Sequence, residues 1–579
     1  MAGGTSGVRH RSLALALVCA LSVSAADRLL LPGPPGNPGG RLVAAVRFEP
    51  RTLNWLVASD SGSREVLALL HADLIHINRE TQTPEPALAR SWKVSPDGKR
   101  WTLELRRGIQ FSDGHSFDAD DVIFTFQAIY DQQVHSPQRD LLLLNGKPIA
   151  IRKIDNSHVE FVLPEARAVA DRLFDAIYIL PRHRLEPLWK AGRLPDAWTL
   201  STPPAEMAGL GPFRVKSYAA GQQIVLERNP YYWKSDSSGR PLPYLDEVRL
   251  LPVGSEDNQV LRFQAGETDL INRVGARNFA LLEKEQARRN LEMRDLGAGL
   301  ETSFLVFNLG EAPGAPEVAA RTAVLRRRSF RQAVSAAIDR AAMVKLVYGG
   351  KADALAGPVA PGNRAWVNAD LATPARNVEQ ARRLLAADGF QWKSGALLDP
   401  GGKPVEFSLL VTNTNPERQQ MAAMIQDDLK AIGVRVEVVP LDFRSLSDRV
   451  QNTRRFETAL MALGSADADP NPDLAVYLSS GGNHLWNPNQ KSPATPWEAE
   501  IDGLMRRQQV TLGYAERKKL FDRVQRLMAD YLPMAPLVSP HILVGAKKGL
   551  RNFRPALLEP YTTWNLDQLY WSHPAGSEQ

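Results

Sequence analysis

The stretch LARSWKVSPDGKRWTLELRRGIQFSDGHSFDADDVIFTF occupies residues 88–126. In its first part, two runs rich in apolar, aromatic and β-branched residues lie on either side of SPDGKR, residues 95–100. Because Pro-Asp-Gly favours a tight turn, this part predicts a β-hairpin. From Asp118 onward the apolar residues recur at helical spacing. The stretch therefore predicts two paired strands followed by a helix.

Four aspartates and a histidine precede the apolar run of that helix, and two interpretations are open. They could form an acid/base or metal cluster, or they could begin the helix. Asp118 stands directly before the apolar face, and Asp121 follows three residues later, which is the spacing of a capping box. Asp120 and Asp121 would then lie in the first turn, at the positive end of the helix dipole. We favour this structural interpretation.

The N-terminus has the pattern of a secretory signal. Arg9 and Arg11 precede about a dozen apolar or small residues, and small residues follow, so we expect cleavage after Ala25 or Ala26, a signal peptide over residues 1–26 and a periplasmic protein. Cys19, the only cysteine, lies inside this signal. It could instead be a lipid-anchored cysteine, but Val18 stands before it where lipoprotein signals usually have a small residue. Residues 27–40 form a Pro/Gly-rich linker.

The net charge and the sequence motifs argue against several classes of protein. The net charge of +6 is spread along the chain, so we expect no nucleic-acid partner. No phosphate-binding glycine loop, zinc-binding helix or nucleophile elbow occurs, and the ten histidines lack metal-ligand spacing. We therefore expect neither a catalytic site, nor a metal site, nor a cofactor. A hydrolase working through paired carboxylates is the enzyme alternative.

The pattern of predicted elements changes near residue 300. Before it, a second hairpin is predicted over residues 211–233, within a mixed α and β region. After it, strands alternate with helices as in a parallel βαβ layer. The predicted strands are 303–310, 405–413 and 434–442, and the predicted helices are 329–350, 377–390, 417–433 and 514–532.

The residues 88–126 resemble the signature region of the extracellular solute-binding proteins of family 5, the oligopeptide and dipeptide receptors of ABC importers. Further blocks resemble the same family in the same order, and together they cover most of the chain from about residue 41 to 570. These blocks are residues 209–233, 245–271, 329–352, 377–390 and 421–439.

This resemblance implies an α/β fold, the two-lobed periplasmic binding protein fold of type II, with mixed sheets and two chain crossings at the hinge. The expected first lobe is 41–300, the second is 301–534, and 535–579 returns to the first. A ligand is expected in the cleft between the lobes, because clefts between domains commonly hold ligands and hinge closure encloses them.

The resemblance also implies ligand-binding residues. In peptide-binding members a carboxylate of the second lobe pairs with the ligand's ammonium group. Within ALMALGSADADPNPD, residues 459–473, that position matches Asp467, with Asp469 as the second choice and Gly464 where the family has Trp. The competing interpretation of this Asp/Pro/Asn cluster is a surface turn.

Further contacts follow from the resemblance or from residue type. Dipeptide receptors can hold a ligand carboxylate with an arginine near the start of the helix that is predicted here over residues 417–433. Gln419 and Gln420 lie nearest to that position, and Arg418 beside them could contact the ligand or be a solvated first-turn charge. Trp366 and Trp486 could form flat pocket walls or pack in the core. Asn54 and Ser61 lie where the family's first loop approaches the ligand.

The function implied is the substrate-binding component of an ABC importer, which captures peptides between its lobes and delivers them to a membrane permease. We expect a monomer. The alternatives are a non-peptide solute, such as a sugar, opine, conjugate or metal chelate, and a receptor that presents its ligand to a sensor. Closure can be favoured only by a ligand that contacts both lobes.

Overall fold

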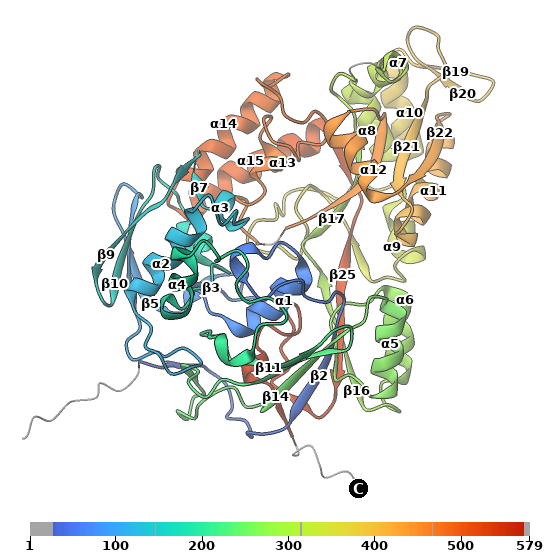
Figure 1. Cartoon of the computed structure of the whole chain (residues 1–579). Helices are drawn as coiled ribbons and strands as arrows, with labels where there is room; N and C mark the ends of the chain where they lie inside the picture. Colours follow the sequence, from blue (N-terminus) through green and yellow to red (C-terminus); the bar gives the residue numbers. More distant parts are fainter. Residues whose placement is uncertain (1–26, 145, 313–314, 466, 573–579) are drawn as a thin grey trace, which may run out of the picture.

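The computed structural model describes residues 27–144, 146–312, 315–465 and 467–572. The expected signal peptide and Cys19 lie outside these residues. The chain forms two lobes, and the long strand β25 (Val538–Lys547) extends from the sheet of the first lobe toward the second (Figure 1). Among the described residues, no helix is long and apolar enough to cross a bilayer.

The first lobe is built on an eight-stranded mixed sheet. The predicted hairpin over residues 211–233 is confirmed, because its two strands pair antiparallel and are joined by a turn at residues 220–222. The strand order is β11 (Phe213–Ala219), β12 (Gln223–Arg228), β14 (Glu247–Pro252), β2 (Arg41–Val46), β15 (Leu270–Ile271), β25, β16 (Leu291–Ala298), and β18 (Ala352–Ala354) also pairs with β25.

A four-stranded antiparallel sheet adjoins the first lobe's helix α2 (Ala119–Tyr130). The predicted hairpin and capping box are both confirmed. The Asp120 N–H donates to the Asp118 carboxylate at 2.8 Å, and the Asp118 N–H donates to Asp121 at 3.0 Å. The strand order is β5 (Ala89–Val94), β6 (Arg100–Leu105), β10 (His158–Val162), β9 (Ala150–Asp155).

The second lobe has a five-stranded sheet in the order β22 (Arg435–Leu441), β21 (Glu406–Thr412), β23 (Thr458–Gly464), β17 (Glu301–Phe307), β24 (Met534–Pro536). The predicted parallel pairing is confirmed for β21 and β22, and β23, which was not predicted as a strand, also runs parallel to β21. It is wrong for β17, which runs antiparallel to both of its neighbours. The reason is that β17 and β24 belong to the chain crossings rather than to a βαβ unit.

Helices cover both faces of this sheet. Side chains alternate along β17, so Leu305 and Phe307 pack in one core while Phe304 and Val306 pack in the other. The helices on the Leu305 side are α8 (Arg328–Ala337), α10 (Val378–Ala387) and α11 (Pro416–Lys430). Those on the Phe304 side are α14 (Pro496–Val510) and α15 (Tyr514–Tyr531).

The prediction of one helix over residues 329–350 is wrong. Ile338 has an extended backbone with ψ of 129°, so α8 ends before it, and α9 (Arg340–Leu346) begins after Asp339. The Asp339 carboxylate accepts the Ala342 N–H at 2.9 Å and caps the new helix. An N-cap side chain inside an apolar helical pattern thus starts a second helix.

The chain passes between the two large sheets twice. It leaves β16 at Ala298 and enters β17 at Glu301, and it leaves β24 at Pro536 and enters β25 at Val538. The expected pair of crossings is therefore confirmed. The lobe boundaries at 300/301 and 534/535 stay predictions.

The other elements connect these layers or lie beside them. The helices are α1 (Ser61–Leu70), α3 (Gln138–Leu141), α4 (Arg182–Lys190), α5 (Glu256–Ala265), α6 (Ala276–Glu285), α7 (Pro316–Leu325), α12 (Phe443–Ser447) and α13 (Leu474–Tyr477). The paired short strands are β1 (Leu29–Leu30) with β13 (Lys234–Ser235), β3 (Ile75–Ile77) with β4 (Pro84–Pro86), β7 (Leu143–Leu144) with β8 (Lys147–Pro148), β19 (Gln391–Lys393) with β20 (Ala396–Leu398), and β26 (Leu550–Arg551) with β27 (Tyr570–Trp571).

Candidate functional site

A pocket of about 810 Å³, including space open to solvent, lies in the second lobe beside the first chain crossing. Its walls come from β17, the end of β23, the loop 355–363, α13, α15 and β24. Most of the wall is apolar. The larger apolar side chains are Leu300, Phe304, Leu355, Val359, Leu463, Val476, Tyr477, Phe521, Met528 and Met534.

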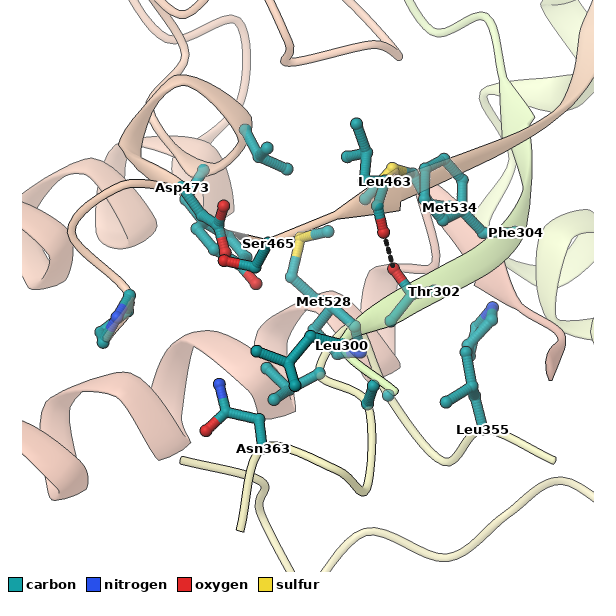
Figure 2. Close-up of a pocket in the computed structure, with 18 of the residues that line it drawn as sticks. Leu300, Thr302, Phe304, Leu355, Asn363, Leu463, Ser465, Asp473, Met528 and Met534 are labelled. Atoms are coloured by element: carbon teal, nitrogen blue, oxygen red, sulfur yellow. Dashed lines mark hydrogen bonds between the residues drawn. The ribbon is translucent and has the colours of Figure 1, made fainter. Parts of the chain in front are cut away.

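Figure 2 shows how polar and apolar side chains divide this pocket. Asp473 lies close to Ser465 on one side, whereas Leu463, Phe304 and Met534 gather on another. Gly464, where the family pattern has Trp, belongs to the lining, and a Cβ on it would meet no atom within 4 Å. The missing side chain therefore leaves this part of the wall open.

Asp473 is the acidic residue in the pocket wall. Burial raises its pKa to about 6, the adjacent Ser465 hydroxyl opposes this shift, and the nearby carboxylates of Asp467 and Asp469 raise the pKa further. Among the described residues, no lysine, arginine or histidine forms an ion pair with Asp473. Asn363 also lines the pocket. Its Nδ2 donates to the Ala468 carbonyl at 2.7 Å, while its buried Oδ1 has no hydrogen-bond partner among the described residues.

Asp467, the predicted ammonium-binding residue, forms an ion pair with Arg172 of the first lobe. The two side chains are 14% and 13% exposed. Burial raises the pKa of Asp467 to about 6, Arg172 lowers it, and Asp469 and Asp175 raise it. The structure therefore places Asp467 where the lobes meet and gives it a protein cation as its partner. Its contact with a ligand stays a prediction.

The same contact region contains a second link between the lobes. Arg172 also donates to the Gln82 carbonyl at 2.8 Å, and the Gln82 amide donates to the Gly362 carbonyl at 3.2 Å. We call these four residues, Gln82, Arg172, Gly362 and Asp467, the interlobe seam. A Cβ on Gly362 would lie 2.2 Å from the Ala298 carbonyl oxygen, so only glycine fits this close approach to the crossing.

Asp469, the second predicted choice, is buried within the second lobe. It accepts two hydrogen bonds from Arg517 of α15, at 2.8 and 2.9 Å, and both side chains are 2% exposed. Arg517 also lies over the Trp366 ring, 4.9 Å from its centroid. Such a bidentate buried pair holds the segment after β23 against α15. The structure thus gives Asp469 a packing role, and its ligand contact stays a prediction.

Arg418 and Gln419 lie in the first turn of α11. Arg418 pairs with Glu301 at 3.2 Å, and Glu301 also pairs with Arg273 of the first lobe at 3.0 Å. Arg418 is therefore part of a three-residue ion-pair group at the crossing rather than a solvated charge. The Gln419 side chain is exposed and donates to the Asn413 carbonyl at 2.9 Å. A ligand-carboxylate clamp at these residues stays a prediction.

The other predicted contacts lie outside the lining of the pocket. Trp366 packs against Tyr514 and Phe521, and Trp486 is fully buried and donates to Glu498 at 3.0 Å. Asn54 is buried and caps a short helix by accepting the Leu56 N–H at 3.1 Å. Ser61 is exposed at the start of α1.

One group among the described residues has the composition of a metal site. The ligand atoms of Asp73, His76 and Asp175 lie within 4.8 Å of one another. However, Asp175 already accepts from Arg79 at 2.9 Å and from the Ile77 N–H at 2.8 Å. A guanidinium at this position competes with a cation, so the group fits an ion-pair network near the lobe contact better than a metal centre.

Residue patterns missed Arg172, Asn363, Asp473 and Glu301. Arg172 lies 295 residues before its partner, and nothing local marks it. In the sequence, Asp473 is marked by its position at the end of the Asp/Pro/Asn cluster, in the same segment as Asp467. Turn-forming residues next to a strand end often place polar groups at a pocket, but they do not tell which carboxylate is left without a cation.

Two lobes joined by a double crossing, with a pocket beside the crossing, define a solute-binding protein of the periplasmic type. The family model of the bacterial extracellular solute-binding proteins, family 5, matches residues 83–484. The chain therefore belongs to this family, as its sequence blocks predicted.

Individual relatives agree with this assignment. A probable ABC transporter-binding protein of Deinococcus radiodurans is 28% identical over 91% of this chain and 92% of its own length. The dipeptide-binding protein of Escherichia coli is 25% identical over 95% of this chain and 96% of its own. The crystal structure of the ABC transporter substrate-binding protein CtaP from Listeria monocytogenes has a TM-score of 0.75 at 22% identity, covering 93% of this chain and all of that one.

Proposed function

We propose that this chain is the substrate-binding component of an ABC importer, which captures a peptide between its lobes and delivers it to a membrane permease. The observation that supports this most is the family match over residues 83–484, together with a dipeptide-binding relative that aligns along almost the whole chain. In this proposal the protein is a monomer, performs no catalysis, and holds no cofactor.

The proposal includes secretion. Proteins of this family are extracellular or periplasmic, and the chain begins with the pattern of a signal peptide over residues 1–26. We propose that this segment is removed on export. An anchor at Cys19 is the alternative, and mass measurement of the mature protein distinguishes them, because cleavage after residue 26 removes Cys19 whereas an anchored form retains it with a lipid.

A non-peptide solute is the second candidate. Its support is the pairing of Asp467 with Arg172, since an ammonium group of a peptide would have to displace a protein guanidinium to reach that carboxylate. A sugar, an opine or a chelate would leave this ion pair in place. Asp467 is still the proposed peptide contact under the first candidate.

Mass spectrometry of the solute that co-purifies with the secreted protein tests the proposal. Calorimetry with peptides of two to six residues, and with neutral sugars and chelates, then measures affinity. Peptide binding with lobe closure in X-ray scattering supports the first candidate. Binding of a defined non-peptide with no peptide affinity supports the second. Turnover of a peptide or glycoside would contradict both.

A further inference from the structure

Strand β25 carries a histidine at the point where it passes from one lobe to the other. The strand extends from the first lobe toward the second (Figure 1). Its first residue, Val538, packs in the core of the second lobe with α8, whereas Leu543 packs in a core of the first lobe with α6. His541 lies between these two residues and pairs with Ala298, the last residue of β16 before the first crossing. His541 therefore lies at the hinge, where the two crossings run side by side.

Each ring nitrogen of His541 faces a carboxylate. Nδ1 lies 2.8 Å from Oδ1 of Asp295 on β16, and Nε2 lies 3.4 Å from Oδ1 of Asp353 on β18. The side chain of His541 is 14% exposed, so solvent screens these contacts only in part. β16 belongs to the first lobe, whereas β18 packs in the core of the second lobe through Ala352. The ring therefore joins one strand of each lobe.

The two contacts require a hydrogen on both ring nitrogens. A carboxylate can only accept, and a neutral imidazole has a single N–H, so a neutral ring would point one lone pair at a carboxylate. The imidazolium donates from both nitrogens and attracts both acids. Burial raises the pKa of Asp295. The Gly297 N–H, Lys351 and His541 outweigh burial and hold that pKa below its ordinary value, which keeps the carboxylate charged.

Lys351 is the other charged side chain at this position. Its Nζ pairs with Asp295 at 3.2 Å and lies 5.0 Å from the centroid of the Phe279 ring of α6. Its carbonyl accepts the backbone N–H of His541 at 3.0 Å. Among the described residues, the charged ones that bond to His541 are thus Asp295, Asp353 and Lys351. Of these side-chain types, histidine is the one that ordinarily changes its charge between pH 5 and 8.

We propose that His541 is a pH-responsive clamp at the hinge, whose protonated ring bridges Asp295 and Asp353 and favours the lobe arrangement in which the interlobe seam forms. Loss of the proton leaves one carboxylate facing a lone pair. The link between β16 and β18 then weakens, and the lobes separate more readily as the pH rises. This device goes beyond the proposed function and acts on the lobes whatever the solute is.

Fluorescence energy transfer between the lobes of the solute-free secreted protein tests this proposal. Dyes are attached at Asp140→Cys in the first lobe and Arg435→Cys in the second, whose native side chains are 84% and 85% exposed. Cys19, the only native cysteine, offers no competing thiol, because signal cleavage removes it and lipidation blocks it. The equilibrium constant for lobe separation is measured at pH 5.5 and at pH 8.0.

The wild type is compared with His541→Gln, which keeps an amide donor but cannot titrate. From pH 5.5 to 8.0 the separation constant of the wild type should rise at least about threefold relative to that of the variant, because one charge-assisted contact is lost. Burial raises the pKa of Asp467 to about 6, so its pairing with Arg172 strengthens over the same range and opposes this change equally in both proteins. His158→Gln is the matched control, because the pair of His158 with Asp155, at 2.9 Å, stays within the first lobe. It should keep the wild-type dependence.

Asp353→Asn is the second variant, at a side chain that is 48% exposed. It leaves the contact of His541 with Asp295 in place and removes the charge at the second-lobe end of the bridge, so it should lose the same part of the pH dependence. Equal dependence in the wild type and His541→Gln, or a smaller rise in the wild type, overturns the proposal. An Asp353→Asn protein with the full wild-type dependence also overturns it, and this variant decides alone if His541→Gln fails to fold.

Discussion

Arg172 and Asp467 form an ion pair that joins the two lobes, although 295 residues separate them in the chain. The pair is mostly buried, and Arg172 is held in place by its second bond to the Gln82 carbonyl. The carboxylate that family resemblance assigns to a ligand is therefore partnered by the protein itself in this structure. The lobes are in contact at this seam.

Replacing Arg172 should shift the lobes toward the open form. Hydrogen bonds to charged groups contribute about 1.5–3 kcal/mol, so Arg172→Gln should destabilise the closed form by a comparable amount. X-ray scattering of the ligand-free protein should then show a larger radius of gyration than for wild type. Arg182→Gln is the matched control, because the ion pairs of Arg182 stay within the first lobe. An unchanged radius would show that the seam does not hold the lobes together.

Asp469→Asn should destabilise the second lobe. The substitution leaves the Arg517 guanidinium buried at 2% exposure without its counter-ion. Removing one partner of such a pair costs about 3–5 kcal/mol. Urea unfolding followed by tryptophan fluorescence measures this, since Trp366 lies beside Arg517. Asp370→Asn removes an ion pair whose carboxylate is 84% exposed and should cost under ~1 kcal/mol. Equal effects of the two substitutions would contradict the packing role of Asp469.

Burial raises the pKa of Asp473 to about 6, and this shift makes the stability of the folded protein depend on pH. The folded pKa of Asp473 lies above its ordinary value of 3.8, so between about pH 4 and 6 the folded state binds more protons than the unfolded state. The contribution of Asp473 to the free energy of unfolding should therefore decrease as the pH rises from about 4 to 6. Thermal melts of wild type and Asp473→Asn should converge at pH 4 and separate at pH 7, with the variant more stable. A variant that is less stable at pH 7 would contradict this.

Asp118→Ala should destabilise the first lobe by about 1 kcal/mol, the usual cost of removing an N-cap. The alanine loses the bond to the Asp120 N–H but leaves the apolar face of α2 unchanged. Asp118→Ser should retain most of the stability, because serine is also a good cap. Denaturant unfolding measures both. If serine were no better than alanine, the capping explanation of this aspartate would be wrong.

The local structure of residues 88–126 follows from the amino-acid sequence of this stretch. A Pro-Asp-Gly turn, alternating strands and an Asp cap act between neighbours a few residues apart, so their energies depend on short-range sequence. This is why the hairpin, the capping box and most helices of the second lobe were predicted with their correct type. The split at Ile338 was missed because the apolar spacing of 329–350 continues through it, and only the Asp339 cap signals the break.

The roles of Asp467, Asp469 and Asp473 could not be obtained in this way. Three carboxylates in one turn-rich segment have the same local chemistry, yet one meets Arg172, one meets Arg517, and one faces the pocket with no cation among the described residues. Coulomb interactions depend on distance in space, and those distances are set by how α15 packs on the second lobe and by how the lobes meet. Family membership and local elements are thus encoded in short stretches, whereas the partner of each charge is a property of the folded chain.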